Sequence, residues 1–174
     1  MEALKFNKWY YIFPIIILCC FVIYCWFFYP LPQTVFLVRH ADKQGNSDAL
    51  SAAGEARAQE LSRVLRHADI VAIYASEFNR TQETAAPIAT DLGLTVILYN
   101  ANDLAALANQ IKSNHSGQNV LVVGHSNTVP STIGLLGISP QPPNIPEQEY
   151  DHLYIVIRHS KILNKLIKLR YGTS

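Results

Sequence analysis

Beyond its first thirty residues the sequence contains no cysteine, since Cys19, Cys20 and Cys25 all lie in an apolar N-terminal segment. The rest of the chain therefore cannot form a disulfide framework, use a thiol nucleophile or build a cysteine-based zinc site. An excess of charge of one sign is also lacking, because 14 Lys and Arg residues balance 13 Asp and Glu residues. This balance provides no field that steers nucleic acid to the surface, so we expect no nucleic-acid partner.

Several catalytic signatures are missing as well. The sequence has no glycine-rich phosphate loop, no Walker pattern and no G-x-S-x-G elbow, which argues against a nucleotide cradle and a serine hydrolase. It also has no cluster of His, Asp and Glu at ligand spacing, so we expect neither a metal nor a cofactor. Among the side chains that form covalent intermediates, histidine is then the available nucleophile.

The N-terminal segment is the longest apolar run. Residues 10–29 contain no charged side chain, and as a helix they would extend about 30 Å, the thickness of a bilayer's hydrocarbon core. We predict a single membrane-spanning anchor over residues 1–30, because a cleaved signal peptide would need a small-residue cleavage site. Lys5 and Lys8 precede the run, which favours a cytoplasmic N-terminus and a periplasmic or extracellular domain.

Residues 31–174 alternate between expected strands and helices. Buried strands are predicted at 33–39, 70–74, 95–99 and 119–123, and a final pair at 151–158 and 162–170. The helices between them begin near Ser51, near Arg80, at Asn102 or Asp103, and near Thr128. This order predicts an α/β fold with a mostly parallel sheet, helices on both of its faces and an antiparallel addition at one edge.

The first predicted strand ends directly at a basic pair of side chains. Val35 to Val38 run into Arg39 and His40, while Arg80 and His125 follow the second and fourth strands. Open α/β sheets bind ligands at the carboxyl ends of their strands, so these side chains are expected to share one crevice. Two arginines and two histidines there suit a phosphoryl group, whose oxygens match the guanidinium fork.

Four motifs then match a known family in order and spacing. They are Val38-Arg39-His40-Ala41, Leu50-Ser51-x-x-Gly54, Ser76-x-x-x-Arg80-Thr81-x-x-Thr84 and Val123-Gly124-His125-Ser126. Over roughly residues 33–158 the chain resembles the histidine phosphatase superfamily, also called phosphoglycerate mutase-like, and its small bacterial members in particular.

The resemblance implies a role for each matched residue. His40 corresponds to the nucleophile that becomes phosphohistidine, and Arg39, Arg80 and His125 to the groups that hold the phosphoryl oxygens. Asn46 is a further candidate for substrate binding. For attack through a neutral nitrogen, the other ring nitrogen of His40 should be held by a backbone carbonyl. The implied activity is hydrolysis of a phosphomonoester or phosphoramidate, carried by a small molecule or an envelope component.

Two features depart from the family pattern. Ala41 stands where a glycine is usual, so its methyl group could narrow the backbone near the phosphate. The acid that protonates the leaving oxygen is not evident either. Asp103 lies at about the expected separation from Arg80, although a helix cap explains it equally well, and the other carboxyl candidates are Glu77, Glu147, Glu149 and Asp151.

Three alternative functions remain. A phosphoglycerate mutase-type phosphotransferase shares the covalent step but must return the phosphoryl group to a second hydroxyl. A non-catalytic phosphate-binding membrane module would keep the pocket without turnover. A phosphatase for phosphohistidine on proteins would require a cytoplasmic domain.

Overall fold

The computed structural model describes residues 9–28, 31–159 and 164–172. Its internal contacts divide the chain into two units, Met1–Pro30 and Leu31–Ser174. The first contains helix α1, Trp9–Phe28. Within the described residues, no helix combines the length and the apolar character needed to cross a bilayer. The predicted membrane-spanning helix over residues 10–29, whose last residue lies outside the described part, is therefore not supported.

The described part of the second unit forms a mixed sheet of six strands in the order β3-β2-β4-β1-β5-β6. The pairs β1–β4, β2–β4 and β2–β3 are parallel, and the pairs β1–β5 and β5–β6 are antiparallel. This arrangement confirms the predicted α/β class and its antiparallel edge. The strands are β1 Gln33–Arg39, β2 Ile70–Ser76, β3 Val96–Tyr99, β4 Asn119–Gly124, β5 His152–Arg158 and β6 Lys165–Arg170.

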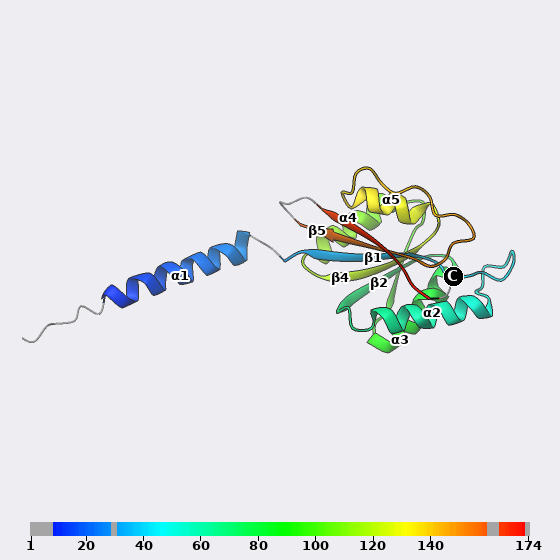
Figure 1. The fold of residues 1–174 in the computed structure, drawn as a ribbon, viewed down its shortest axis with the longest axis horizontal. Helices are drawn as coiled ribbons and strands as arrows, with labels where there is room; N and C mark the ends of the chain where they lie inside the picture. The colour runs from blue at the N-terminus through cyan, green and yellow to red at the C-terminus, as the bar shows by residue number, and fades with distance from the viewer. Residues whose placement is uncertain (1–8, 29–30, 160–163, 173–174) are drawn as a thin grey trace, which may run out of the picture. The chain divides into compact units, whose positions relative to one another are not determined.

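Helices cover both faces of this sheet, as predicted (Figure 1). Helices α2, Ala52–Leu65, and α3, Asn79–Leu92, lie on one face, and α4, Leu104–Asn114, and α5, Thr128–Leu135, on the other. Alternate residues of β1 therefore enter different cores: Val35 and Leu37 pack with α4 and α5, whereas Phe36 and Val38 pack with α2 and α3. Burial on both faces explains why β1 has a continuous apolar run.

The element boundaries follow the sequence signals with small shifts. Ser51 caps α2 by accepting a hydrogen bond from Gly54 N–H, and Gly93 ends α3 in the left-handed conformation with φ of 64°. β2 continues to Ser76, two residues beyond the predicted end, because it pairs with β3 up to Tyr99. β6 begins at Lys165, and the start of the predicted last strand, residues 162–163, lies outside the described part.

A close backbone approach explains the glycine of the Leu50-Ser51-x-x-Gly54 motif. Gly54 is buried in the first turn of α2, where a Cβ atom would lie 2.1 Å from the carbonyl oxygen of Asp42. That carbonyl also accepts from Ser51 N–H at 2.9 Å, so it cannot move away without breaking the start of the helix. The motif therefore holds the loop after β1 against α2.

We predict that Gly54→Ala lowers the free energy of unfolding by about 1–3 kcal/mol, although alanine is the better helix former. Urea denaturation of the full chain measures this loss. Gln59→Ala, an exposed change in the same helix, should stay within about 0.5 kcal/mol of the unaltered chain. A Gly54→Ala protein as stable as the Gln59→Ala control would contradict the close approach.

Candidate active site

The pocket lies at the carboxyl ends of β1, β2 and β4, where the sequence predicted it. Arg39 and Gly124 are register partners at the ends of β1 and β4, and one residue further His40 N–H donates to the Gly124 carbonyl at 2.8 Å. His125 follows Gly124 directly, so the rings of His40 and His125 lie 5.5 Å apart between their centroids. The cavity around them measures about 580 Å³, more than a phosphoryl group alone needs.

His40 is held as a neutral nucleophile. Its Nδ1 lies 2.8 Å from the Ala41 carbonyl oxygen, and because a carbonyl can only accept, Nδ1 carries the proton and Nε2 keeps its lone pair. Burial, together with the positive charges of Arg39 and Arg80, lowers the pKa of His40 to about 3, although the hydrogen bond to the Ala41 carbonyl acts in the opposite direction. The ring is thus uncharged at neutral pH, with its proton on Nδ1, as the hypothesis drawn from the sequence required.

His125 is held in one tautomer by its neighbours. The Arg80 guanidinium lies 3.3 Å from Nδ1 and can only donate, so His125 Nε2 carries the proton and donates to Ser76 Oγ at 2.8 Å. Burial and the Arg80 charge lower the pKa of His125 to about 4. The backbone N–H of His125 donates to Thr128 Oγ1 at 2.8 Å, which ties the residue to the start of α5.

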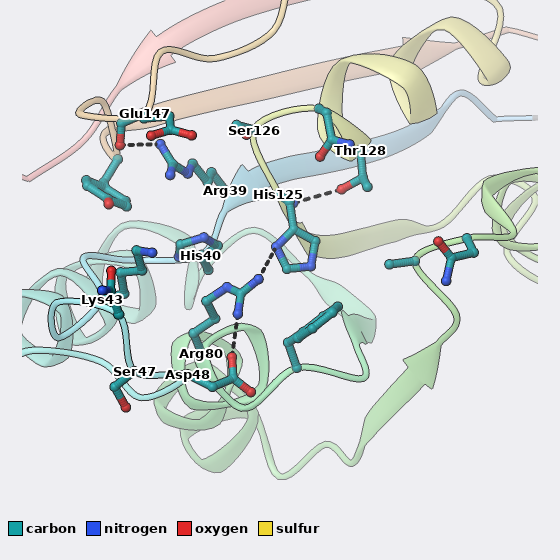
Figure 2. Close-up of a pocket in the computed structure, with 16 residues that line it drawn as sticks. Arg39, His40, Lys43, Ser47, Asp48, Arg80, His125, Ser126, Thr128 and Glu147 are labelled. Carbon is teal, nitrogen blue, oxygen red and sulfur yellow. Dashed lines mark hydrogen bonds and ion pairs between the residues drawn. The ribbon is translucent and has the colours of Figure 1, made fainter.

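Arg80 lies in the first turn of α3 between an acid and an aromatic ring. Its Nη1 donates to Asp48 Oδ1 at 2.5 Å, and Asp48 Oδ2 accepts from Asn79 N–H at 2.9 Å. The Arg80 guanidinium also lies 4.5 Å from the centre of the Phe78 ring, which packs against His125 in turn. These contacts, visible in part in Figure 2, direct the guanidinium toward the two histidines.

Arg39 is held by backbone oxygens rather than by a carboxylate. Its Nη1 donates to the carbonyls of Pro146 and Glu147 at 2.9 and 2.7 Å, with a longer contact of 3.3 Å to that of Glu149. The guanidinium lies 4.2 Å from the centre of the Tyr150 ring. Arg39 is only 5% exposed, so the segment 146–150 closes over it.

The two arginines keep unused hydrogen-bonding capacity. Within the described residues, the buried Nε atoms of both Arg39 and Arg80 lack a hydrogen-bond partner. Buried cationic donors are costly when unpaired, and an anion in the pocket would relieve that cost. The described pocket therefore has the donor set of an oxyanion site, with a neutral imidazole beside it.

The structure gathers most of the predicted site residues and leaves one out. His40, Arg39, Arg80, His125 and Asn46 all line the cavity, whereas Asp103 does not. Asp103 is instead the N-cap of α4, where its carboxylate accepts from Ala106 N–H at 3.0 Å. The prediction of Asp103 as a catalytic acid is thus not supported, because its carboxylate satisfies the first turn of the helix.

The methyl group of Ala41 does not narrow the pocket. Ala41 is fully buried beside Leu50 and Ala58, away from the cavity lining, and its N–H donates to Thr84 Oγ1 at 2.9 Å. The departure from the usual glycine is therefore accommodated in the small core under the loop.

Asp48, Phe78 and Tyr150 also line the cavity, although none of them was predicted from the sequence as a site residue. Asp48 lies two residues before Leu50 of the second motif, and Phe78 lies within the third motif, two residues before Arg80. These positions were the available signal. Tyr150 had no such signal, because it reaches Arg39 only through the fold.

Acid should destabilise the domain in a window set by the buried histidines. An unfolded histidine takes up a proton near pH 6.5, whereas His40 and His125 do so only near pH 3 and 4. Between these values the unfolded state binds more protons, so the free energy of unfolding falls as the pH falls, by up to about 1.4 kcal/mol per pH unit for each histidine.

We predict that His40→Asn makes this slope between pH 6.5 and 4.5 shallower, as measured by urea denaturation at a series of pH values. His152, whose pKa is also lowered by burial, accounts for part of the remaining slope. An unchanged slope in the variant would show that His40 is not held neutral by the fold.

Known proteins share the family pattern and the fold. Residues 35–104 match the family model "Histidine phosphatase superfamily (branch 1)", and no curated protein matches the chain significantly. An Escherichia coli K-12 structure, assigned as an alpha-ribazole-5'-P phosphatase, is 17% identical with a TM-score of 0.63, over 82% of this chain and 99% of that chain.

Two further solved structures share this fold. The protein histidine phosphatase SixA complexed with tungstate is 19% identical with a TM-score of 0.56, over 79% of this chain and 96% of that one. The mycobacterial glucosyl-3-phosphoglycerate phosphatase is 16% identical with a TM-score of 0.59, over 81% and 100%. The family model covers the first three of the four motifs, and the three solved structures share the fold. These matches support the resemblance to the histidine phosphatase superfamily.

Proposed function

We propose that the domain hydrolyses a phosphomonoester or a phosphoramidate through a phosphohistidine intermediate on His40. One observation carries the proposal: a buried, neutral His40 has Nε2 free while its Nδ1–H is held by a carbonyl. Two arginines with unpaired buried Nε atoms flank it. Phosphoryl transfer needs mainly positioning and charge stabilisation, which this set can supply.

In the first step Nε2 of His40 forms a bond to phosphorus while the bond from phosphorus to the leaving group breaks. Arg39, Arg80 and His125 are assigned the non-bridging oxygens, whose charge the guanidinium groups stabilise. Water then attacks the phosphohistidine, the N–P bond breaks, and neutral His40 and inorganic phosphate result. Nδ1 keeps its proton and its hydrogen bond to the Ala41 carbonyl throughout. This hydrogen bond stabilises the positive charge on the ring in the intermediate.

The shape of the pocket supports a phosphorylated small molecule as substrate. Beyond the phosphoryl site the cavity is lined by short polar side chains, Asn46, Ser47, Asn102, Ser126 and Asn127. Amide and hydroxyl groups of this kind bind hydroxylated substrates through hydrogen bonds. The shared fold includes a protein histidine phosphatase and a phosphatase of a glycosylated phosphoglycerate, which supports the reaction class more than any one substrate.

The test is turnover of a ³²P-labelled aryl phosphate by the full chain, with acid-labile label trapped on the protein. His40→Ala should abolish both the trapped label and the release of phosphate, because it removes the attacking nitrogen. His67→Ala, an exposed histidine outside the pocket lining, should retain both. Turnover that survives His40→Ala would exclude His40 as the nucleophile.

Transfer of the label and binding of inorganic phosphate separate the hydrolase from two of the alternatives. A mutase would transfer the label to a second hydroxyl of an added polyol phosphate instead of releasing it to water. A phosphate-binding module would bind inorganic phosphate in equilibrium dialysis, lose that binding in Arg80→Ala, and show no turnover on sugar phosphates, lipid phosphates or phosphoramidates. Either result would replace the hydrolase proposal.

A further inference from the structure

Cleavage of a phosphomonoester requires an acid near His40, because an alkoxide is a poor leaving group unless it receives a proton. Figure 2 and the cavity lining place two carboxyl groups among the described lining residues, Asp48 and Glu147. The other acids considered from the sequence do not line the cavity, and each is already hydrogen-bonded or ion-paired. Glu77 accepts from Ala101 N–H at 2.9 Å, and Glu149 and Asp151 pair with Arg170 at 2.8 and 2.9 Å.

Asp48 is poorly suited to donate a proton. Its two carboxylate oxygens accept hydrogen bonds from Asn79 N–H and from the Arg80 guanidinium. These bonds hold the pKa of Asp48 below its ordinary value, so it remains a carboxylate at neutral pH. Its role is to position Arg80. The proton transfer is therefore left to Glu147, the other described lining residue with a carboxyl group.

Glu147 has the features that the acid needs. Its backbone carbonyl accepts from Arg39 Nη1 at 2.7 Å, which holds the residue at the edge of the phosphoryl site. Within the described residues no hydrogen bond engages its carboxyl group, and the side chain is exposed to the solvent that would resupply its proton. In Figure 2 it lies on the side of the histidine pair opposite Asp48.

From this geometry we propose that Glu147 is the general acid of the reaction, an assignment that rests on the proposed function. A dianionic phosphoryl group in the pocket favours the protonated form of a nearby carboxyl group, since like charges repel. As the ester P–O bond breaks, the Glu147 proton passes to the leaving oxygen, which departs as an alcohol. The resulting carboxylate then takes a proton from the water that attacks phosphohistidine, and the starting state returns.

The experiment varies the leaving group. We expect Glu147→Gln in the full chain to lower kcat/KM for an alkyl phosphate by about 100-fold, the size of a general-acid contribution, but to change it by less than about threefold for 2,4-dinitrophenyl phosphate. Dinitrophenolate can leave without taking up a proton, whereas an alkoxide leaving group needs to receive one. Equal losses on both substrates, or no loss on either, would overturn the assignment.

Two control variants separate this role from a structural one. Asp48→Asn should lower kcat/KM for both substrates by the same factor. The change weakens the positioning of Arg80, and Arg80 holds the phosphoryl group whichever leaving group departs. Asp103→Asn, which alters a helix cap outside the pocket, should leave the ratio between the two substrates unchanged. A change in that ratio in Asp103→Asn would transfer the acid role to Asp103 and overturn the assignment to Glu147.

The failure of this inference differs from the failure of the proposed function. If His40→Ala still turns over 2,4-dinitrophenyl phosphate, the phosphohistidine route itself is wrong. If His40 is essential and Glu147→Gln shows no dependence on the leaving group, only the identity of the acid is wrong. Thermal unfolding of Glu147→Gln should match that of the unaltered chain, because the side chain is exposed and its backbone contact to Arg39 remains.

Discussion

The candidate site depends on the hydrogen bond that His40 N–H donates to the Gly124 carbonyl. It extends the parallel β1–β4 ladder one residue beyond the strands, so that the residues following each strand stay side by side. Gly124 has to lack a side chain there, because a Cβ atom would lie 2.8 Å from Thr128 Oγ1 and 2.9 Å from the Tyr99 hydroxyl. Tight packing at that point sets the separation of the two histidines.

Cationic side chains gather in the pocket at the end of this ladder, and acidic neighbours only partly neutralise them. Arg39 is held by three backbone carbonyls and an aromatic ring, none of which carries a full negative charge. Asp48 balances only Arg80, and both histidines stay neutral because they are buried next to the arginines. The cationic lining residues Arg39, Lys43 and Arg80 outnumber the acidic ones, Asp48 and Glu147. The pocket therefore keeps an excess of positive charge, which is the electrostatic condition for binding a dianion.

The segment that covers Arg39 is itself anchored at the edge of the sheet. Glu149 accepts from Arg170 of β6 at 2.8 Å and lies 2.5 Å from the ring of His152 in β5. The same residue offers its carbonyl to Arg39. The antiparallel pair at the edge therefore does more than extend the sheet, because it holds the loop that carries Glu147 and Tyr150 in place beside the pocket.

Local sequence determined a large part of this protein. Strand β1, its burial on both faces and the position of Arg39 and His40 at its end followed from Val35 to Val38 and the charges after them. The Ser51 cap and the Gly93 end of α3 followed from local chain chemistry as well. The four motifs, each at the end of a strand or the start of a helix, carried the family resemblance that implied the reaction class.

Tertiary structure alone decided which carboxyl groups reach the pocket. Asp103 stood at a suitable distance along the chain, yet its carboxylate caps α4, whereas Glu147 lies 108 residues after Arg39 and its backbone carbonyl accepts a hydrogen bond from it. The contact of Tyr150 with Arg39 was equally invisible in the sequence, and the motif beside Asp48 did not indicate that its carboxylate accepts from Arg80. Periodicity and spacing report on neighbours along a strand or helix, but contacts between loops depend on how the sheet brings distant segments together.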